Sequence, residues 1–308
     1  MELLIFGTSL MWGQGLRDAD KMHNVLARKL HAHQPDRRVN VTFLAHSGAS
    51  TGYLPDGTID SKSAPLINGE VPTRYPTILQ EIDSFDQVGI APESIDLIVL
   101  DAGINDVHLK SVLDPLVTPR KIAEMVELYC HQHMALLLSK LLDKFPRARI
   151  VVAGYYEFVT EDSEQSYVRG LLQTFGKVPG GFIFDGMLWL LNRPIRQRLL
   201  TNCDTFSDRS WAAFNQTADE MNARTPGNNR VLVARPNIKP ENAAFASDPW
   251  LFGLTEDASP EDPMAQERAR ACRAAGSRAE PIFCSTASTG HPNPKGTNAY
   301  AEAILAVL

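Results

Sequence analysis

The sequence predicts an α/β fold: a mostly parallel, five-stranded sheet with helices on both faces, within one domain that spans residues 1–308. Five short apolar runs alternate with longer segments whose apolar residues recur at helical spacing. Strands that alternate with helices pair in parallel through right-handed crossovers, and the helices then cover both faces of the sheet. A chain of 308 residues is long enough for one large domain of this kind.

The first half of the chain supplies three strands and a helix. Glu2–Phe6 is a short apolar run typical of a buried strand. Asp20–His33 carries apolar residues at helical spacing, and Pro35 follows the expected end of this helix. Val41–Ala45 is the second predicted strand, and the nearly continuous apolar run Ile95–Asp101 is typical of a central parallel strand.

The second half continues the alternation. A long amphipathic helix begins at Thr118, a suitable N-cap with proline at the first helical position, and ends before Pro146. The remaining predicted elements, in order, are a strand over Arg149–Tyr155, a helix over Ser207–Ala223, a strand over Arg230–Ala234 and a closing helix over Gly296–Leu308.

Three segments exceed the usual length of a connection and are expected as long loop or helical insertions: residues 49–91, 157–203 and 239–288. The first should contain a short helix over Thr77–Ile82. The second holds Phe182–Leu191, which has one charge, is too short to cross a bilayer, and predicts either a core helix or an apolar lid. In the third, a basic patch that includes Arg268 is expected to be a solvated face.

Charge and hydropathy exclude two classes of partner. A net charge of −6 favours solubility and argues against a nucleic-acid surface. No run reaches 18 apolar residues, so no transmembrane helix is expected. Met1–Phe6 has no basic flank and is too short for the apolar region of a signal peptide. We therefore expect a chain without a leader, either cytoplasmic or secreted with its leader removed.

The four cysteines match neither a zinc motif nor a CxxC motif, so no metal site is expected. Cys130 lies on the apolar side of the helix that begins at Thr118 and should be a buried free thiol. Cys272 and Cys284 flank a loop, and their spacing allows either a disulfide in an oxidising compartment or two free thiols.

Four short motifs lie after strands or before a helix, in this order along the chain: Gly7-Thr8-Ser9, Gly48, Gly103-Ile104-Asn105-Asp106 and His291-Pro292. Because ligands bind at the carboxyl ends of the strands in open α/β sheets, the first three motifs should meet at one edge of the sheet. His291 comes just before the last helix, where a loop can bring its imidazole to the same edge.

Together these motifs supply the groups needed for acyl transfer through a covalent intermediate. Ser9 is the candidate nucleophile, and His291 is the base that takes its proton. The backbone N–H groups of Ser9 and Gly48 and the side-chain amide of Asn105 are candidate donors to the oxyanion. The aromatic side chains expected to line the substrate pocket are Trp12, Tyr53 and Tyr155.

The ordered set resembles the SGNH (GDSL-like) hydrolase superfamily over most of the chain. The resemblance rests on Gly7-Thr8-Ser9-Leu10, Gly48, Gly103-x-Asn105-Asp106 and His291-Pro292-Asn293-x-x-Gly296. It implies a three-layer α/β/α fold with a flavodoxin-like sheet, and hydrolysis of a small-molecule ester or lipid without metal or cofactor. It also implies that Ser9 is the nucleophile, His291 the base, and Gly48 and Asn105 the oxyanion donors.

Two positions depart from the pattern of this superfamily. Thr8 stands where the superfamily has an aspartate, a change we expect to matter little. Ser288 stands where it has the aspartate that orients the catalytic histidine. Three explanations are open: a backbone carbonyl or the Ser288 hydroxyl orients His291, the enzyme is weak or inactive, or another carboxylate replaces the acid, with candidates Asp106, Asp248 and Asp262. Restoring the acid with Ser288→Asp is expected to raise activity.

Two other functions fit the same motifs. An acyltransferase would pass the acyl group from Ser9 to an alcohol instead of water. A non-catalytic binding protein would keep the scaffold without the chemistry, and the serine at position 288 favours this alternative. If the run Phe182–Leu191 caps the site, it favours an acyl chain or a lipid as substrate.

Overall fold

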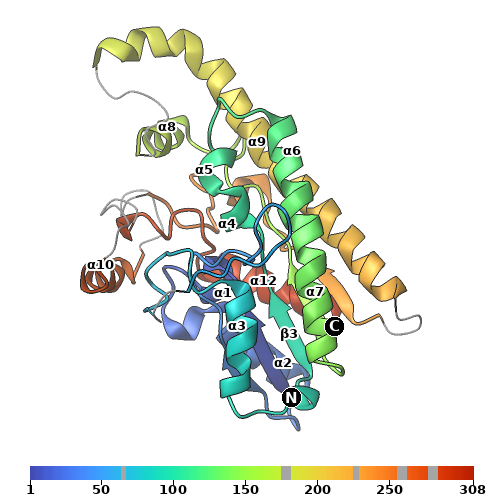
Figure 1. Cartoon of the computed structure of the whole chain (residues 1–308). Helices are drawn as coiled ribbons and strands as arrows, with labels where there is room; N and C mark the ends of the chain where they lie inside the picture. Colours follow the sequence, from blue (N-terminus) through green and yellow to red (C-terminus); the bar gives the residue numbers. More distant parts are fainter. Residues whose placement is uncertain (64–66, 175–181, 225–228, 255–261, 277–283) are drawn as a thin grey trace.

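The computed structural model describes residues 1–63, 67–174, 182–224, 229–254, 262–276 and 284–308, with the backbone alone for 174 and 182–192. Its centre is a five-stranded sheet in which neighbouring strands are parallel, in the order β2-β1-β3-β4-β5. Helices cover both faces of this sheet (Figure 1). The predicted three-layer α/β/α architecture with a flavodoxin-like strand order is therefore confirmed.

The strands lie where the sequence predicts them, but several end earlier. Their bounds are β1 Glu2–Phe6, β2 Asn40–Phe43, β3 Leu97–Leu100, β4 Arg149–Ala153 and β5 Val231–Ala234. β3 is buried along its whole length, as expected for a central strand. The prediction placed Asp101 and Tyr155 inside strands. Both lie instead just beyond the strand ends, where the Tyr155 hydroxyl donates to Asp101 Oδ2 at 3.2 Å.

Helices from distant parts of the chain form the two outer layers. α2 (Met22–His33) and α12 (Pro294–Val307) pack against each other on one face. On the other face lie α3 (Ile78–Ser84), α7 (His133–Lys144) and α9 (Phe182–Ala223) (Figure 1). Each layer buries an apolar helix stripe against the sheet, which supplies most of the stability of such elements.

The long helix predicted after Thr118 consists of three consecutive segments. α6 (Pro119–Val126) begins at Thr118, η4 (Glu127–Gln132) is a π-helical turn, and α7 follows. The wider turn places the buried Cys130 against Gly103, where a Cβ would lie 2.9 Å from Cys130 Sγ. The predicted long helix is therefore confirmed, and the π-helical turn within it is a detail that helical periodicity does not reveal.

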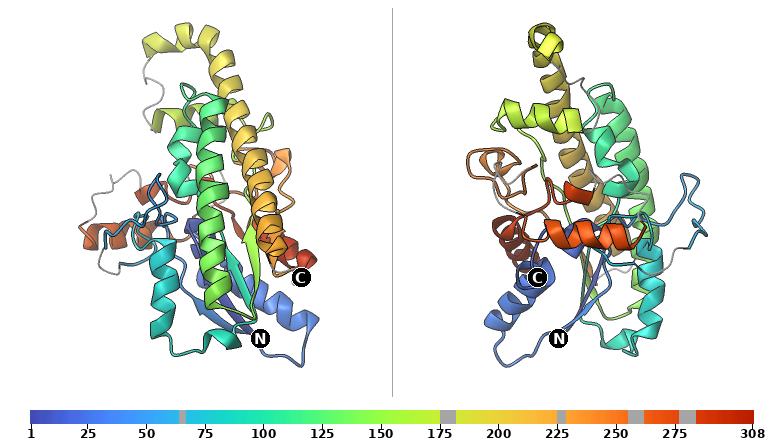
Figure 2. Two further views of the ribbon diagram at one scale, coloured as in Figure 1. Left: turned by 45° about the vertical axis from the view of Figure 1, so that its right-hand side comes forward. Right: turned by 90° about the vertical axis from the view of Figure 1, so that its left-hand side faces the viewer.

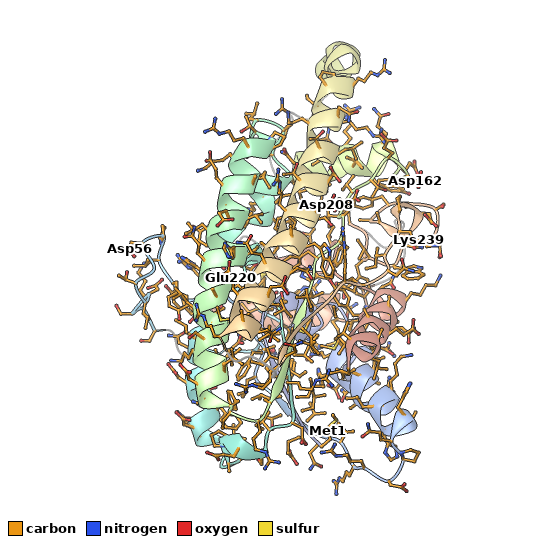
Figure 3. All side chains as sticks on the ribbon, turned by 90° about the vertical axis from the view of Figure 1, so that its right-hand side faces the viewer. Met1, Asp56, Asp162, Asp208, Glu220 and Lys239 are labelled. Atoms are coloured by element: carbon orange, nitrogen blue, oxygen red, sulfur yellow. A yellow bond between two sulfur atoms is a disulfide. The ribbon has the colours of Figure 1, made fainter. Side chains whose placement is uncertain are left out.

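α9 connects the sheet layer with the region beyond the strand ends. Its carboxyl-terminal part contains the predicted helix Ser207–Ala223 and lies beside η4, where Glu220 pairs with His131 at 3.2 Å (Figure 3). Its amino-terminal part rises past the strands, near α8 (Gln165–Thr174) (Figure 2). Phe182–Leu191 opens this helix. The side chains of this run lie outside the described residues, so the choice between a core helix and a lid stays a prediction.

Shorter elements connect the layers and carry site residues. They are α1 (Ser9–Trp12), η1 (Asp18–Asp20), η2 (Phe85–Gln87), η3 (Pro92–Ser94), α4 (Ile104–Val107), α5 (Leu109–Val112), η5 (Pro240–Asn242) and α10 (Ala265–Ala274). α4 and α5 lie beyond the carboxyl ends of the strands (Figure 1). Among the described residues, none of the helices combines the length and the apolar content that a bilayer span requires.

Candidate active site

Ser9 lies just beyond the carboxyl end of β1, as the first residue of α1. The turn between strand and helix requires Gly7, whose φ is 133° and where a Cβ would lie 2.5 Å from Asp101 Oδ1. Thr8 then caps α1, and its side chain accepts a hydrogen bond from the Leu10 N–H at 3.3 Å. The strand, the glycine turn and the cap together hold the Ser9 hydroxyl at the sheet edge.

Thr8 also pairs with a buried carboxylate beyond the end of β3. Its N–H donates to Asp101 Oδ1 at 2.8 Å, and its hydroxyl donates to Asp101 Oδ2 at 2.5 Å. Burial raises the pKa of Asp101 to about 6, although hydrogen bonds from Thr8 and Tyr155 oppose this shift. An aspartate at position 8 would bring a second carboxylate to this buried one. Asp101 therefore gives a physical reason for the threonine.

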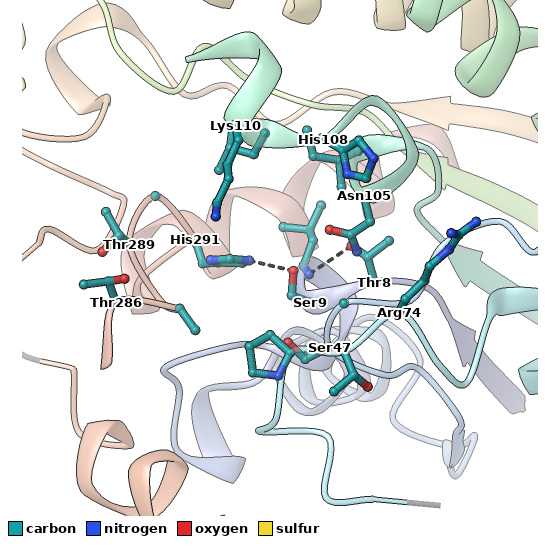
Figure 4. A pocket seen from close by; sticks show the side chains of 18 of the residues that line it. Thr8, Ser9, Ser47, Arg74, Asn105, His108, Lys110, Thr286, Thr289 and His291 are labelled. Carbon is teal, nitrogen blue, oxygen red and sulfur yellow. Dashed lines mark hydrogen bonds between the residues drawn. The ribbon is translucent and has the colours of Figure 1, made fainter. Parts of the chain in front are cut away.

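His291 reaches Ser9 from the other end of the chain. Its Nε2 lies 2.7 Å from Ser9 Oγ (Figure 4), and its Nδ1 lies 3.2 Å from the main-chain carbonyl oxygen of Ser288. A ring that donates Nδ1–H to this carbonyl leaves the Nε2 lone pair facing the serine hydroxyl. Burial lowers the pKa of His291 to about 4, so the ring is neutral at pH 7 and can accept a proton.

None of the three carboxylates considered as replacements for the missing acid hydrogen-bonds to the His291 ring. Two are held elsewhere by contacts of 3.0 Å or less: Asp106 by Thr51 and Asp248 by Lys295. The third, Asp262, accepts the Ser288 hydroxyl on its Oδ2 at 2.5 Å. The structure therefore places the Ser288 carbonyl against the ring, with the hydroxyl of the same residue turned to Asp262.

Asn105 and Gly48 lie near Ser9, and Figure 4 shows Asn105 and His291 on opposite sides of the serine. Asn105 Nδ2 donates to the Ala49 carbonyl at 2.8 Å, which fixes the amide and leaves its second N–H for a ligand. Gly48 has a φ of 84°, and a Cβ there would lie 2.2 Å from the Thr73 carbonyl oxygen, so this position requires glycine. In the described part of the chain, the N–H groups of Ser9 and Gly48 donate to no other residue.

A cavity of about 1140 Å³ opens at these residues, and Ser9, Gly48, Asn105 and His291 all line it. Tyr155 lines it too. Much of the remaining wall is apolar and includes Val71, Ile104, Leu109, Val112, Phe158 and Phe206. A wall of this kind suits a ligand with an apolar part.

Trp12 and Tyr53, both predicted to line the pocket, lie outside the lining of this cavity, so that prediction is wrong. Trp12 Nε1 donates to Glu70 Oε1 at 3.1 Å, and Lys21 Nζ lies 3.8 Å from the centre of the indole ring. Tyr53 packs against His133, with ring centroids 5.5 Å apart. Both residues follow site motifs closely in sequence, but their side chains point into neighbouring packing.

Sequence reasoning missed two cationic residues at the cavity, Arg74 and Lys110, which lie around Asn105 and His108 in Figure 4. They belong to a loop and a short helix that carry no motif. It was also wrong about Arg268, which is fully buried and not on a solvated face. An arginine in a basic patch looks the same in sequence whether or not the fold brings buried carboxylates to it.

The cysteines divide into two classes. Cys272 and Cys284 form a disulfide, so one of the two open alternatives is realised. This disulfide links α10 to the segment that leads to His291. Cys130 is a buried free thiol, as predicted, and Cys203 is another.

Comparison with solved structures finds relatives of this fold. An extracellular lipase from Streptomyces rimosus matches over 100% of both chains, with a TM-score of 0.51 and 14% identity. A phospholipase A1 from Streptomyces albidoflavus matches over 100% of this chain and 99% of its own, with a TM-score of 0.48 and 15% identity. At such identities the likeness to the lipase shows a shared fold, and the lower score of the second match adds no argument. No protein-family model and no curated protein sequence matches the chain.

Proposed function

We propose that this chain is an SGNH-type serine hydrolase that cleaves carboxylic esters. The observation that carries the proposal is the 2.7 Å distance between Ser9 Oγ and His291 Nε2 at the edge of the sheet. A serine hydroxyl becomes an effective nucleophile when a neutral base lies within hydrogen-bond reach. The fold shared with a lipase supports the same assignment.

The reaction proceeds in two halves. Ser9 Oγ attacks the ester carbonyl carbon while its proton passes to His291 Nε2, and the carbonyl oxygen becomes an oxyanion. The N–H groups of Ser9 and Gly48 and the Asn105 amide donate to this oxygen. His291 returns the proton to the leaving alkoxide, which departs as an alcohol and leaves an acyl-Ser9 ester. Water then attacks this ester with His291 as base, releases the carboxylic acid and restores the serine.

The Ser288 carbonyl takes the place that an aspartate holds in a catalytic triad. It fixes the ring orientation through the 3.2 Å contact with Nδ1. It offers a partial negative charge to the imidazolium that forms during attack, whereas a carboxylate offers a full one. We therefore expect a working Ser9–His291 dyad.

The substrate is an ester with an apolar acyl chain, since apolar side chains form much of the cavity wall. A cavity of about 1140 Å³ is far larger than an acetyl group requires. Turnover should therefore rise with acyl-chain length from p-nitrophenyl acetate to p-nitrophenyl octanoate. A maximum at acetate would contradict this substrate class.

The test of catalysis compares the wild type with Ser9→Ala on the same esters. We expect the variant to lose about 10⁴-fold or more in kcat, because the covalent intermediate can no longer form. A fluorophosphonate probe should label the wild type at Ser9 and leave the variant unlabelled. Equal ester turnover in both proteins would contradict the proposal, and failure of the probe to label the wild type would favour a non-catalytic binding protein.

A further inference from the structure

Arg268 on α10 is fully buried and is the largest completely buried side chain among the described residues. Burying a guanidinium group is costly unless carboxylates and hydrogen-bond acceptors surround it. The partners that compensate this cost come from two segments that hold opposite sides of the candidate site.

On the base side, Arg268 binds the loop that carries His291. Its Nη2 donates to Asp262 Oδ2 at 2.5 Å, the same oxygen that accepts the Ser288 hydroxyl at 2.5 Å. Its Nε donates to the Cys284 carbonyl at 2.6 Å, and Nη2 also lies 3.2 Å from the Ser285 carbonyl oxygen. Arg268 thus fixes the main chain on the amino-terminal side of the Ser288 carbonyl that faces His291.

On the oxyanion side, Arg268 Nη1 lies 4.0 Å from Glu70 Oε2, within ion-pair distance. The same Glu70 oxygen accepts a hydrogen bond from Gln14 Nε2 at 3.0 Å. Gln14 Oε1 in turn accepts the hydroxyl of Ser47, the residue before Gly48. A chain of polar contacts therefore runs from Arg268 to the loop that presents the Gly48 N–H group.

We propose that Arg268 is a positioning residue that sets the His291 loop and the Gly48 loop relative to each other across the site. The inference rests on the proposed function, since it concerns the same site. A planar guanidinium suits this role because it presents donors along several edges at once, so one group can face Asp262 and Glu70 together. A lysine ammonium at this position would face one of the two carboxylates and lose the contact with the other.

The test compares Arg268→Met and Arg268→Lys with a matched control, Arg270→Met, on the exposed side of the same helix. With p-nitrophenyl butyrate, we expect both Arg268 variants to lose at least tenfold in kcat with a KM within about twofold of the wild type. The control should keep wild-type values. Glu70→Gln should lower kcat as well, and combining it with Arg268→Met should cost less than the product of the two single losses, because both act on one network.

A pH profile separates positioning from a general loss of folded protein. Burial has the largest effect on the pKa of His291; of the nearby charges, Arg268 lowers this pKa and Asp262 raises it. The other charged or titratable side chains that line the cavity are Arg74, His108, Lys110, Tyr155, Tyr156 and Cys203. The acid limb of kcat/KM should therefore move to higher pH in Arg268→Met and to lower pH in Asp262→Asn. A purely structural role would lower the amplitude and leave the limb in place.

Two outcomes overturn the proposal. One is a folded Arg268→Met, judged by near-ultraviolet circular dichroism, whose kcat stays within twofold of the wild type. The other, which holds even if Arg268→Met does not fold, is that Glu70→Gln and Asp262→Asn both keep wild-type kcat and the wild-type acid limb. If the wild type itself hydrolyses no ester, the proposed function fails. The titration of His291 by NMR in Asp262→Asn and Arg268→Met then still tests the coupling.

Discussion

The proposed nucleophile side of the site and its proposed base side are held in place by different means. Ser9 lies on α1 and Asn105 lies on α4, and each comes shortly after a motif glycine that follows a strand. His291 lies between α10 and α12, held by the disulfide Cys272–Cys284 and by the ion pair of the buried Arg268 with Asp262. Backbone turns at the strand ends therefore position the first side, whereas a disulfide and a side-chain ion pair position the second.

This difference indicates where the site tolerates change. Backbone turns at the strand ends belong to the sheet, whose strands are among the most buried parts of the described chain. The His291 loop depends on a few contacts, and losing any one of them should affect catalysis more than folding. Three predictions test this contrast, in addition to the tests of Ser9 and Arg268.

The largest of the three effects is expected on the nucleophile side. Asn105→Ala removes one candidate oxyanion donor and the 2.8 Å hydrogen bond to the Ala49 carbonyl. We expect kcat to fall about 10²–10³-fold, the typical cost of losing one such donor. The measurement is kcat on p-nitrophenyl butyrate, with thermal unfolding as the control for folding. A loss below about fivefold would remove Asn105 from the oxyanion site.

An intermediate effect is expected at Ser288, where the structure reverses the expectation from the sequence. The hydroxyl lies 2.5 Å from Asp262 Oδ2, so an aspartate here would place two carboxylates together. Ser288→Asp should therefore lower kcat by about 30-fold, equivalent to about 2 kcal/mol. The matched variant Ser288→Ala keeps the carbonyl against His291 and should lose less than tenfold. A Ser288→Asp enzyme more active than the wild type would show that Asp262 does not restrain this loop.

The smallest effect is expected from the disulfide. Its cysteines are 12 residues apart, and closing a loop of such length stabilises a fold by about 3 kcal/mol. Cys272→Ser combined with Cys284→Ser should lower the unfolding temperature and reduce kcat severalfold through the His291 loop. Labelling by a fluorophosphonate should slow by the same factor, since acylation needs the base. If the melting temperature falls and kcat does not change, the disulfide supports α10 without positioning His291.

Much of the fold was predictable because its signals are local. The apolar runs that form β1 and β3, and the helical spacing of α2, are fixed by residues close together in sequence. The candidate nucleophile and oxyanion residues were predictable for the same reason, since each follows a strand. The single-domain boundary over residues 1–308 stays a prediction.

Other features could not be predicted because they depend on pairing across the chain. Trp12 lies near Ser9 in sequence, yet its indole turns to Glu70 and Lys21, which only the folded chain brings close. The burial of Arg268 depends in the same way on Glu70, Asp262 and the Cys284 carbonyl meeting around it. The spacing of these residues in the sequence does not predict that they come together around the arginine.

The sequence by itself determined the α/β architecture, the order of the strands along the chain and the residue types gathered at the carboxyl edge of the sheet. Only the tertiary structure decided which group faces the His291 ring, because a carbonyl, a hydroxyl and three carboxylates were all chemically suitable. The physical reason is that the apolar runs of strands and the periodicity of helices depend on residues that are close together in sequence. The choice among acceptors depends on where each folded segment lies relative to the ring: the carbonyl of Ser288, three residues away in sequence, faces it, whereas Asp106 and Asp248 are held by Thr51 and Lys295.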